Sequence, residues 1–204
     1  LRRALAVVGI ALAAFVAVYT GMLLMAAENV PLWNTPLLPV LFSVSAFDTG
    51  VALVELVAVL ASKKDPLAPK ARTLMERIVV VLVLLEGVVM AAFLASMLGG
   101  DAQTAIGATA ASSASLLVSG GLAVCFWGMV VACGLALPLV MAVAGLVLHG
   151  RAKKKPGAGQ HGSGVLMAMG AAGALVGGCE LRFLILAAGV HADVVAETVR
   201  GLIG

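Results

Sequence analysis

Charged side chains are scarce in this sequence of 204 residues. Aspartate, glutamate, lysine and arginine make up 11% of it and hydrophobic residues 62%, whereas a soluble domain contains about 25% charged residues. Thirteen basic and ten acidic side chains cannot give a domain of this size a polar surface. Intrinsic disorder is excluded as well, because disordered segments are polar and highly charged. The composition therefore places the chain in a lipid bilayer.

Residues that bind metals and prosthetic groups are also few. The histidines and cysteines are His149, His161, His191, Cys125, Cys133 and Cys179. The histidines lie at the ends of apolar segments or between them, so no two of them can ligate a haem buried between helices. The cysteines form no CxxC motif, and their number excludes an iron–sulfur cluster, a structural zinc and a c-type haem. We therefore expect no haem, no iron–sulfur cluster and no metal bound by this chain.

Nucleotide-binding motifs are missing too. Residues 157–162 match GxGxxG in letters only, because they follow no strand and lie in a lysine- and glycine-rich stretch between two apolar segments. No P-loop occurs, so the sequence gives no support to nucleotide-driven pumping. The lysines between the apolar segments could suggest nucleic-acid binding, but the orientation of the chain in the membrane and attraction to anionic lipid account for them. We therefore expect contact with the lipid bilayer and no nucleic-acid partner.

The sequence does contain five long apolar runs. Each can cross a hydrocarbon core of about 30 Å as an α-helix, whereas a membrane barrel would show alternating segments of about ten residues. We expect an all-α integral membrane fold, a single transmembrane helical domain over residues 1–204 with spans at about 4–27, 37–61, 75–98, 121–148 and 163–189. Residues 101–119 are rich in Ala, Ser and Thr and fit either an amphipathic helix on the outer surface or an unstructured loop.

Basic residues are distributed unevenly around these spans. Eleven of the 13 precede the first span or lie around the second and fourth connections. Five alternating crossings place all eleven on one side of the membrane, which the positive-inside rule assigns to the cytoplasm. The sequence therefore predicts a multi-pass protein of the inner (cytoplasmic) membrane, with its C-terminus outside.

The first outer connection, residues 28–36, carries two prolines and a tryptophan. Proline prevents a helix from continuing, and tryptophan prefers the level of the lipid headgroups. The simplest interpretation of Trp33 is an interface anchor. The alternative is a role for Trp33 and Asn34 in gating a ligand site.

Acidic residues inside the apolar spans are the most informative feature. The spans contain Asp48, Glu55, Glu86, Glu180 and one base, Arg182. A charge at the centre of a bilayer costs about 2.5–3.5 kcal/mol on insertion scales, so such residues face a bundle interior, pair with one another or carry protons. Asp48 and Glu55 are seven residues apart, which places them on one face of a helix, about 10 Å apart along its axis.

Depth along the spans orders these residues. Counting at about 1.5 Å per residue from the ends of the spans gives an order from inside to outside of Glu55, Glu86 and Asp48, followed by the level of Tyr19 and Arg182. Such an order suits a proton relay bridged by water. The alternative is a set of interhelical hydrogen bonds or ion pairs without a transport role.

Several segments resemble the NrfD/polysulfide reductase membrane-subunit family. They are residues 19–24 (YTGMLL), 31–42 (PLWNTPLLPVLF), 43–45 (SVS), 75–86, 135–138 (LALP) and 181–189 (LRFLILAAG). The resemblance covers about residues 5–190. Family members usually have eight or more spans, so the five spans of this chain look like the last five of an eight-helix double bundle, and about three N-terminal helices are absent from the sequence.

The resemblance implies a haem-free subunit that oxidises quinol or reduces quinone. Its exchangeable cofactor would be menaquinone or ubiquinone, and its partners an outer-face iron–sulfur subunit of the four-cluster type and a molybdopterin or multihaem subunit. The family's quinone pocket would include Tyr19, with Thr20 and Gly21 as its neighbours, and the 28–36 connection adds Trp33 and Asn34. The phenol of Tyr19 could hydrogen-bond a quinone carbonyl, or it could be buried against a backbone carbonyl.

Two other classes of function remain as alternatives. Intramembrane acids also mark proton- or cation-coupled transporters, and Pro138 could break the fourth span. A transporter of that kind usually shows an internal repeat, and this sequence contains no convincing one. A passive anchor is disfavoured by the cost of four buried carboxylates. We therefore expect the membrane subunit of a quinone-dependent oxidoreductase complex, with no catalytic residue of its own and with proton handling by the buried acids.

Overall fold

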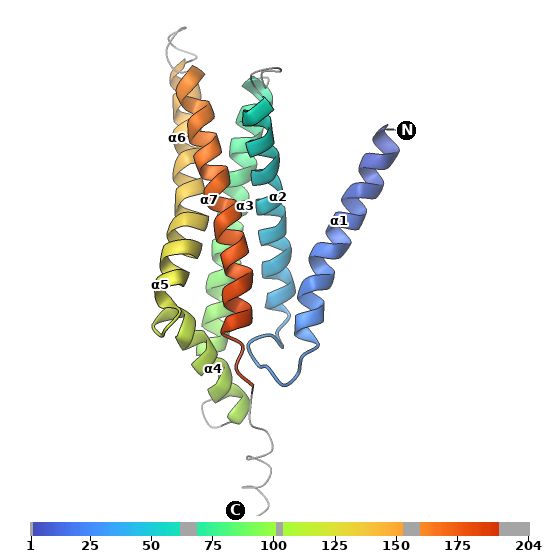
Figure 1. The fold of residues 1–204 in the computed structure, drawn as a ribbon, viewed down its shortest axis with the longest axis vertical. Helices are drawn as coiled ribbons and strands as arrows, with labels where there is room; N and C mark the ends of the chain where they lie inside the picture. The colour runs from blue at the N-terminus through green and yellow to red at the C-terminus, as the bar shows by residue number, and fades with distance from the viewer. Residues whose placement is uncertain (1, 62–68, 101–103, 153–159, 192–204) are drawn as a thin grey trace, which may run out of the picture. The chain divides into compact units, whose positions relative to one another are not determined.

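The computed structural model describes residues 2–61, 69–100, 104–152 and 160–191 (Figure 1). The helices are α1 (Arg2–Met25), α2 (Leu37–Ala61), α3 (Pro69–Leu98), α4 (Ala105–Val118), α5 (Ala123–Cys125), the π-helix η1 (Phe126–Ala136), α6 (Leu137–Ala152) and α7 (Gln160–Ala187). No β-strand occurs in the described ranges, and the expected all-α fold is confirmed. Residues 157–159 of the glycine-rich stretch at 157–162 and the C-terminal residues 192–204 lie outside the described residues.

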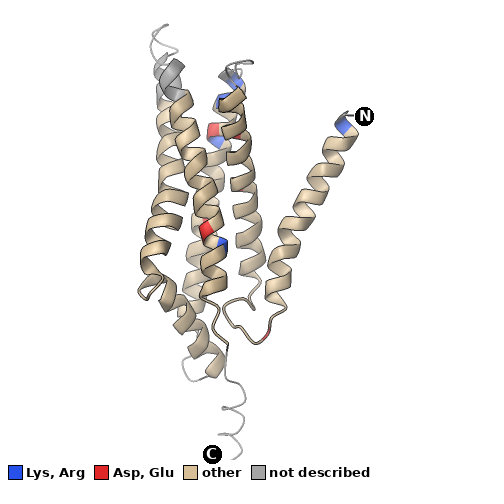
Figure 2. Ribbon diagram, viewed as in Figure 1, with Lys and Arg blue, Asp and Glu red and all other residues tan. Residues whose placement is uncertain are grey.

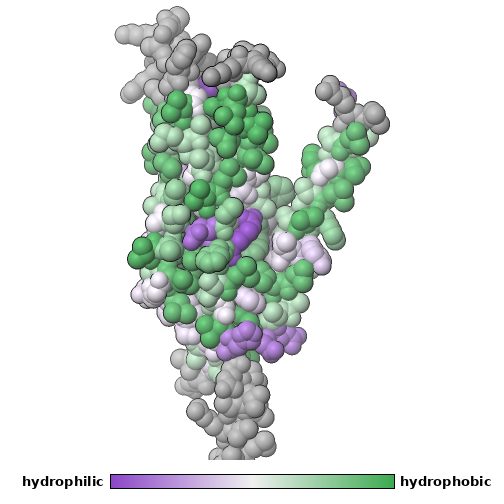
Figure 3. All heavy atoms as spheres, in the orientation of Figure 1, coloured by the Kyte–Doolittle hydropathy of each residue, from purple (hydrophilic) through white to green (hydrophobic). Residues whose placement is uncertain are grey.

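Five helical segments are long and apolar enough to cross a membrane. They are Arg3–Met25, Leu37–Ala61, Lys70–Leu98, Ala123–Val147 and Gly164–Ala187. Large apolar side chains such as Leu53, Val81 and Val140 are exposed on these helices, and Figure 3 shows a mainly hydrophobic surface over the described elements. Such a surface is stable only when lipid or another apolar partner covers it, which is as expected for transmembrane helices.

The helices fall into two compact units. Unit 1 contains Leu1–Ser43, Val88–Ala123 and Arg182–Gly204, and unit 2 contains Val44–Gly87 and Val124–Leu181. The parts of α2, α3, α6 and α7 that form unit 2 run side by side (Figure 1). Two apolar clusters hold them together: Ala52 packs with Ala171 and Ala174, and Val79 and Val83 pack with Ala142.

The fourth span changes from a π-helix to an α-helix at a proline. In η1 the hydrogen bonds follow a wider register, and its last one joins the N–H of Leu137 to the carbonyl of Ala132. The next residue, Pro138, has no N–H to continue this register. The span is therefore a continuous helix with a change of winding at Pro138, and the break that the sequence allowed does not occur. The buried residues of η1 are Phe126, Val130 and Gly134.

Glycines allow η1 and α7 to pack closely within unit 2. A Cβ atom on Gly134 would lie 2.7 Å from the Cα of Gly177, and one on Gly173 would lie 2.5 Å from the carbonyl oxygen of Cys133. Real Cβ atoms do not approach other atoms so closely. The small-xxx-small pair Gly173 and Gly177 therefore packs two backbones together, as is usual in membrane bundles.

In unit 1, residues 105–118 form the helix α4. Thr104 caps its N-terminus, because its hydroxyl accepts a 3.1 Å hydrogen bond from the N–H of Gly107. The buried residues of α4 recur at helical spacing and form one stripe: Gly107, Ala110, Ser113, Ala114 and Leu117. Of the two interpretations of residues 101–119, the helix is therefore the one observed over the described positions.

Candidate functional site

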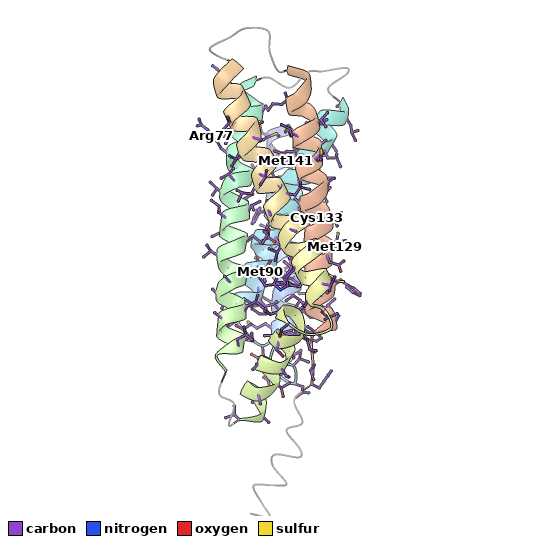
Figure 4. All side chains as sticks on the ribbon, turned by 90° about the vertical axis from the view of Figure 1, so that its left-hand side faces the viewer. Arg77, Met90, Met129, Cys133 and Met141 are labelled. Carbon is purple, nitrogen blue, oxygen red and sulfur yellow. The ribbon has the colours of Figure 1, made fainter. Side chains whose placement is uncertain are left out.

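Unit 2 contains a cavity lined by three acidic side chains. Asp48 and Glu55 of α2 and Glu76 of α3 line it together with Pro138 and Met141 of α6. Figure 4 shows Met141 on the same continuous helix as Met129 and Cys133. The cavity is small, with a volume of about 10 Å³, and it is partly open to the outside. The room within is enough for roughly one water molecule.

Helix geometry brings two of the acids to the cavity. Asp48, Ala52 and Glu55 occur at positions i, i+4 and i+7 of α2, which lie on one face of a helix. All three are buried, with Asp48 2% and Glu55 5% exposed. The small side chain of Ala52 packs against α7 between the two carboxylates. The predicted common face of Asp48 and Glu55 is therefore the face that lines the cavity.

The carboxylate of Asp48 is incompletely satisfied. Its Oδ1 atom is buried and has no hydrogen-bond partner among the described residues, and the same holds for Oγ of Ser45, one turn earlier on α2. An unpaired buried polar atom costs about 1–3 kcal/mol. Asp48 is also one of the residues that line the cavity.

Electrostatic interactions connect the buried acids of unit 2. Asp48 interacts with Glu86, and Glu55 interacts with both Glu76 and Asp48. Glu86 is itself buried at 4% exposure on α3. Asp48 is thus coupled to both Glu55 and Glu86, whereas depth counting alone placed Glu86 between the other two.

Glu76 is a buried acid to which the sequence gave no role. The predicted span began at about residue 75, and Glu76 was not included among the acids inside the spans. In the structure α3 begins six residues earlier, at Pro69, a residue that suits the first helical position because its ring fixes φ and it needs no N–H there. Glu76, Val79, Val83 and Glu86 are all buried, and their helical spacing was the signal that could have found Glu76.

Glu180 and Arg182 of α7 are not among the residues that line the cavity. Glu180 is half-buried and belongs to unit 2. Arg182 belongs to unit 1, where its guanidinium lies 5.7 Å from the centre of the Phe42 ring. Such a cation–π contact contributes about 0.5–2 kcal/mol. Figure 2 shows how few positions of the described helices carry charge at all.

The quinone-site candidates Tyr19, Thr20, Gly21, Trp33 and Asn34 all belong to unit 1. Tyr19 is 50% exposed, and its ring stacks on Phe15 with 6.0 Å between centroids. Its phenol makes no hydrogen bond to the described residues, so a Tyr19 buried against a backbone carbonyl is not observed. The hydroxyl of Thr20 donates to the carbonyls of Val16 and Ala17 in its own helix.

Gly21 is buried where α1 meets the start of α2. A Cβ atom on it would collide with the backbone of Pro39. Gly21 therefore sets the approach of α1 to α2, and its place in a quinone pocket stays a prediction.

Trp33 has a structural role. Its indole N–H donates a 2.9 Å hydrogen bond to the carbonyl of Ile185, one of the last four carbonyls of α7, which lack partners within the helix. The ring also lies against Gly189, where a Cβ atom would come within 2.6 Å of its Cε2 atom. Trp33 therefore caps the end of α7, and its role as an interface anchor or in a ligand site stays a prediction. Its neighbour Asn34 is exposed.

No group of three or more His, Cys, Asp or Glu side chains that could hold a metal ion occurs within the described ranges. Cys125, Cys133 and Cys179 are free thiols. The three acids of the cavity are therefore a set of carboxylates around water-sized space, and this arrangement can accept, hold and release protons.

The fold and the cavity define an all-helical integral membrane protein that keeps carboxylates buried between its spans. The chain matches the family model "Polysulphide reductase, NrfD" over residues 1–193, and it belongs to that family. The predicted resemblance is confirmed.

Two relatives show how much of the family's length is present. The polysulfide reductase C subunit of Wolinella succinogenes is 36% identical over 187 residues, which make up 92% of this chain and 54% of that protein. Protein NrfD of Escherichia coli K12 is 30% identical over 188 residues, 92% of this chain and 53% of that protein. The chain thus spans about half the length of these relatives. No solved structure matches it.

Proposed function

We propose that the chain is a quinone-interacting membrane subunit of a respiratory oxidoreductase complex, and that its buried acids carry protons. The observation that carries the proposal is the cavity of unit 2, in which three buried carboxylates surround water-sized space in a chain of the NrfD family. Burying these acids in an apolar bundle costs free energy, and acids that are kept there in spite of this cost usually have a functional role.

The exchangeable cofactor in this proposal is menaquinone or ubiquinone, bound in unit 1. Tyr19 fits a quinone carbonyl, because its half-exposed phenol has a donor that no described residue uses. Thr20 and Trp33 fit less well, because both donors are already bonded to backbone carbonyls. A quinone supplies two-electron chemistry coupled to two protons. Tyr19 would orient its head group, with Asn34 as a second exposed polar group nearby in the chain.

The proton route in this proposal lies in unit 2. Glu86, Asp48 and Glu55 are buried acids of one unit that interact electrostatically, and Asp48 and Glu55 line the cavity with its room for water. Each carboxylate would take a proton on one oxygen and release it to the next through water. Glu180 and Arg182, which do not line the cavity, are assigned no step in this series.

The proposed partners are an iron–sulfur subunit of the four-cluster type and a molybdopterin or multihaem subunit. Support comes from the family and from its relatives, one of which is the C subunit of a polysulfide reductase. The proposed location is the inner membrane with residues 62–68 on the cytoplasmic side, in agreement with the distribution of basic residues.

Purification with partners tests the proposal. The tagged protein is isolated from its native membranes in mild detergent, and co-purifying proteins, quinone content and quinol-dependent electron transfer are measured. We expect an iron–sulfur partner and quinol-dependent activity that a quinone analogue inhibits. A protein that purifies alone and moves protons or cations in liposomes without quinol would contradict the proposal and support a transporter.

A further inference from the structure

The carboxylate of Glu76 occupies a seat formed by a glycine of another helix. Glu76 is 3% exposed, although the adjacent Arg77 points away from the helices (Figure 4). A Cβ atom on Gly145 of α6 would lie 2.5 Å from Oε1 of Glu76 and 2.9 Å from its Cδ. Any side chain at position 145 would therefore displace the carboxylate. Both residues belong to unit 2.

Glu76 lies at one end of the group of buried acids that also contains Glu55, Asp48 and Glu86. Glu76 is seven residues from the start of α3, about 10 Å along the helix axis. Its carboxylate lines the cavity beside Glu55 and interacts with it electrostatically. Asp48 lines the same cavity, and its buried Oδ1 atom has no hydrogen-bond partner among the described residues. The water-sized space in the cavity is where a proton-bearing ligand such as water would fit.

A simpler role for Glu76 is as a charge partner of Arg72. Arg72 is one turn earlier on the same face of α3, and its Nη2 atom lies 3.4 Å from the Cβ position of Gly164 on α7. Among the described residues, the charged groups near Glu76 include Arg72 from α3 and Glu55 from α2, and the part of α6 closest to its carboxylate is Gly145. A charge-partner role does not require contact with the cavity or coupling to Glu55.

We propose that Glu76 is the terminal carboxylate of the proton route, and that Gly145 is a positioning residue that turns it towards Glu55. This inference rests on the proposed function. Glu76 takes a proton from water at the end of the bundle where α3 begins and passes it to the carboxylate of Glu55, or carries it in the reverse direction. Only a proton moves, so no electron donor or acceptor is required.

The test uses the whole complex in proteoliposomes, with quinol-dependent electron transfer and protons taken up per electron as separate readouts. We expect Glu76→Gln and Gly145→Ala each to slow proton uptake by about tenfold or more, a range typical of a lost proton carrier. Glu76→Asp shortens the side chain and leaves room for a Cβ atom. The double variant Glu76→Asp with Gly145→Ala should therefore recover proton uptake relative to Gly145→Ala alone. Gly50→Ala, where a Cβ atom meets nothing within 4 Å, is the matched control.

The variant Asp48→Asn distinguishes failure of the Glu76 inference from failure of the proposed proton route. If Asp48→Asn loses proton uptake while Glu76→Gln and Gly145→Ala match the parent, Glu76 is not on the route and the proposed function stands. If Asp48→Asn also matches the parent, the proton route itself is wrong.

Chemical labelling covers the case in which the Gly145 variant does not assemble. The unmodified complex is treated with a water-soluble carbodiimide, and mass spectrometry locates the labelled carboxylates. We expect label on Glu76 ahead of Glu55 and Asp48. Label on Glu55 or Asp48 without label on Glu76 overturns the inference.

Discussion

The indole N–H of Trp33 donates a 2.9 Å hydrogen bond to the backbone carbonyl of Ile185. The two residues are 152 positions apart in the sequence, so this single bond ties the connection between α1 and α2 to the last turn of α7 within unit 1. The neighbouring amides of that turn are already used, since Ala188 donates to Leu184 and Gly189 donates to Leu186.

Replacement of Trp33 by phenylalanine tests this cap. Trp33→Phe keeps an aromatic ring and removes the donor, which leaves the carbonyl of Ile185 without its partner. We expect a loss of about 1–3 kcal/mol, which lowers the melting temperature by several degrees in a chain of this size. The measurement is thermal unfolding in detergent. Phe183→Leu, at an exposed position of α7, is the control, and an equal loss there would contradict the cap.

Gly189 should be sensitive for a related reason. Gly189→Ala places a methyl group against the indole ring of Trp33 and should destabilise the protein to a similar degree, whereas Gly9→Ala meets nothing within 4 Å and should not. The two sites share one contact, so Gly189→Ala should cost little more once Trp33→Phe is present. Additive losses in thermal unfolding would show that the two sites are independent.

Tyr19 should affect quinol turnover through its hydroxyl. Tyr19→Phe removes a donor that no described residue uses, so assembly should survive. Loss of one hydrogen bond of about 0.5–1.5 kcal/mol corresponds to a two- to twelve-fold fall in turnover or in affinity for a quinone analogue. Phe47→Leu, an exposed aromatic on α2, serves as control. Unchanged turnover together with unchanged inhibition would rule out Tyr19 as a ligand of the quinone.

The buried acids should differ from their amides in proton movement. Glu86→Gln, Asp48→Asn and Glu55→Gln keep shape and hydrogen bonding and lose the ability to carry a proton as a carboxylate does. We expect each to assemble and to slow proton uptake in proteoliposomes by about tenfold or more. Thr49→Val is the matched control, because the Thr49 hydroxyl only donates to carbonyls of its own helix. Three variants that match the parent in both rates would make the acids packing elements.

The contact between η1 and α7 should tolerate no side chain. Gly177→Ala forces a methyl group into the backbone of Gly134, and we expect a clear loss of assembled protein in the membrane fraction. Gly128→Ala, on the same helix as Gly134, has open space around it and should assemble normally. Assembly of Gly177→Ala at the parental level would mean that the two helices can separate without cost.

Much of the fold could be predicted because membrane insertion leaves a strong signal in the sequence. Long apolar runs are required for spanning a bilayer, so the number of spans follows from composition. The pairing of Asp48 and Glu55 was also predictable, since a seven-residue spacing fixes a common face on any α-helix. Glu76 was missed because α3 extends beyond its apolar run, and apolarity alone does not mark a helical start at Pro69.

The remaining site details depend on contacts between distant segments. Nothing around Trp33 in the sequence indicates that its partner is Ile185, and a glycine seat for Glu76 can be seen only when α6 is placed beside α3. The same limit applies to Arg182. Its depth suggested the proton series, whereas in the structure it lies over the ring of Phe42 and does not line the cavity.

The change from π-helical to α-helical winding in the fourth span determines which of its side chains face the neighbouring helices. From Phe126 to Ala142 its buried positions recur every fourth residue, at Phe126, Val130, Gly134, Pro138 and Ala142. A π turn holds more than four residues and an α turn about 3.6. Every fourth side chain therefore rotates in one direction around the helix axis through η1 and in the opposite direction through α6. The two rotations offset each other, so the five buried positions form one seam that faces the neighbouring helices. If η1 were wound as an α-helix, Phe126 would rotate out of that seam, whereas a deletion near the end of α6 would leave the seam intact.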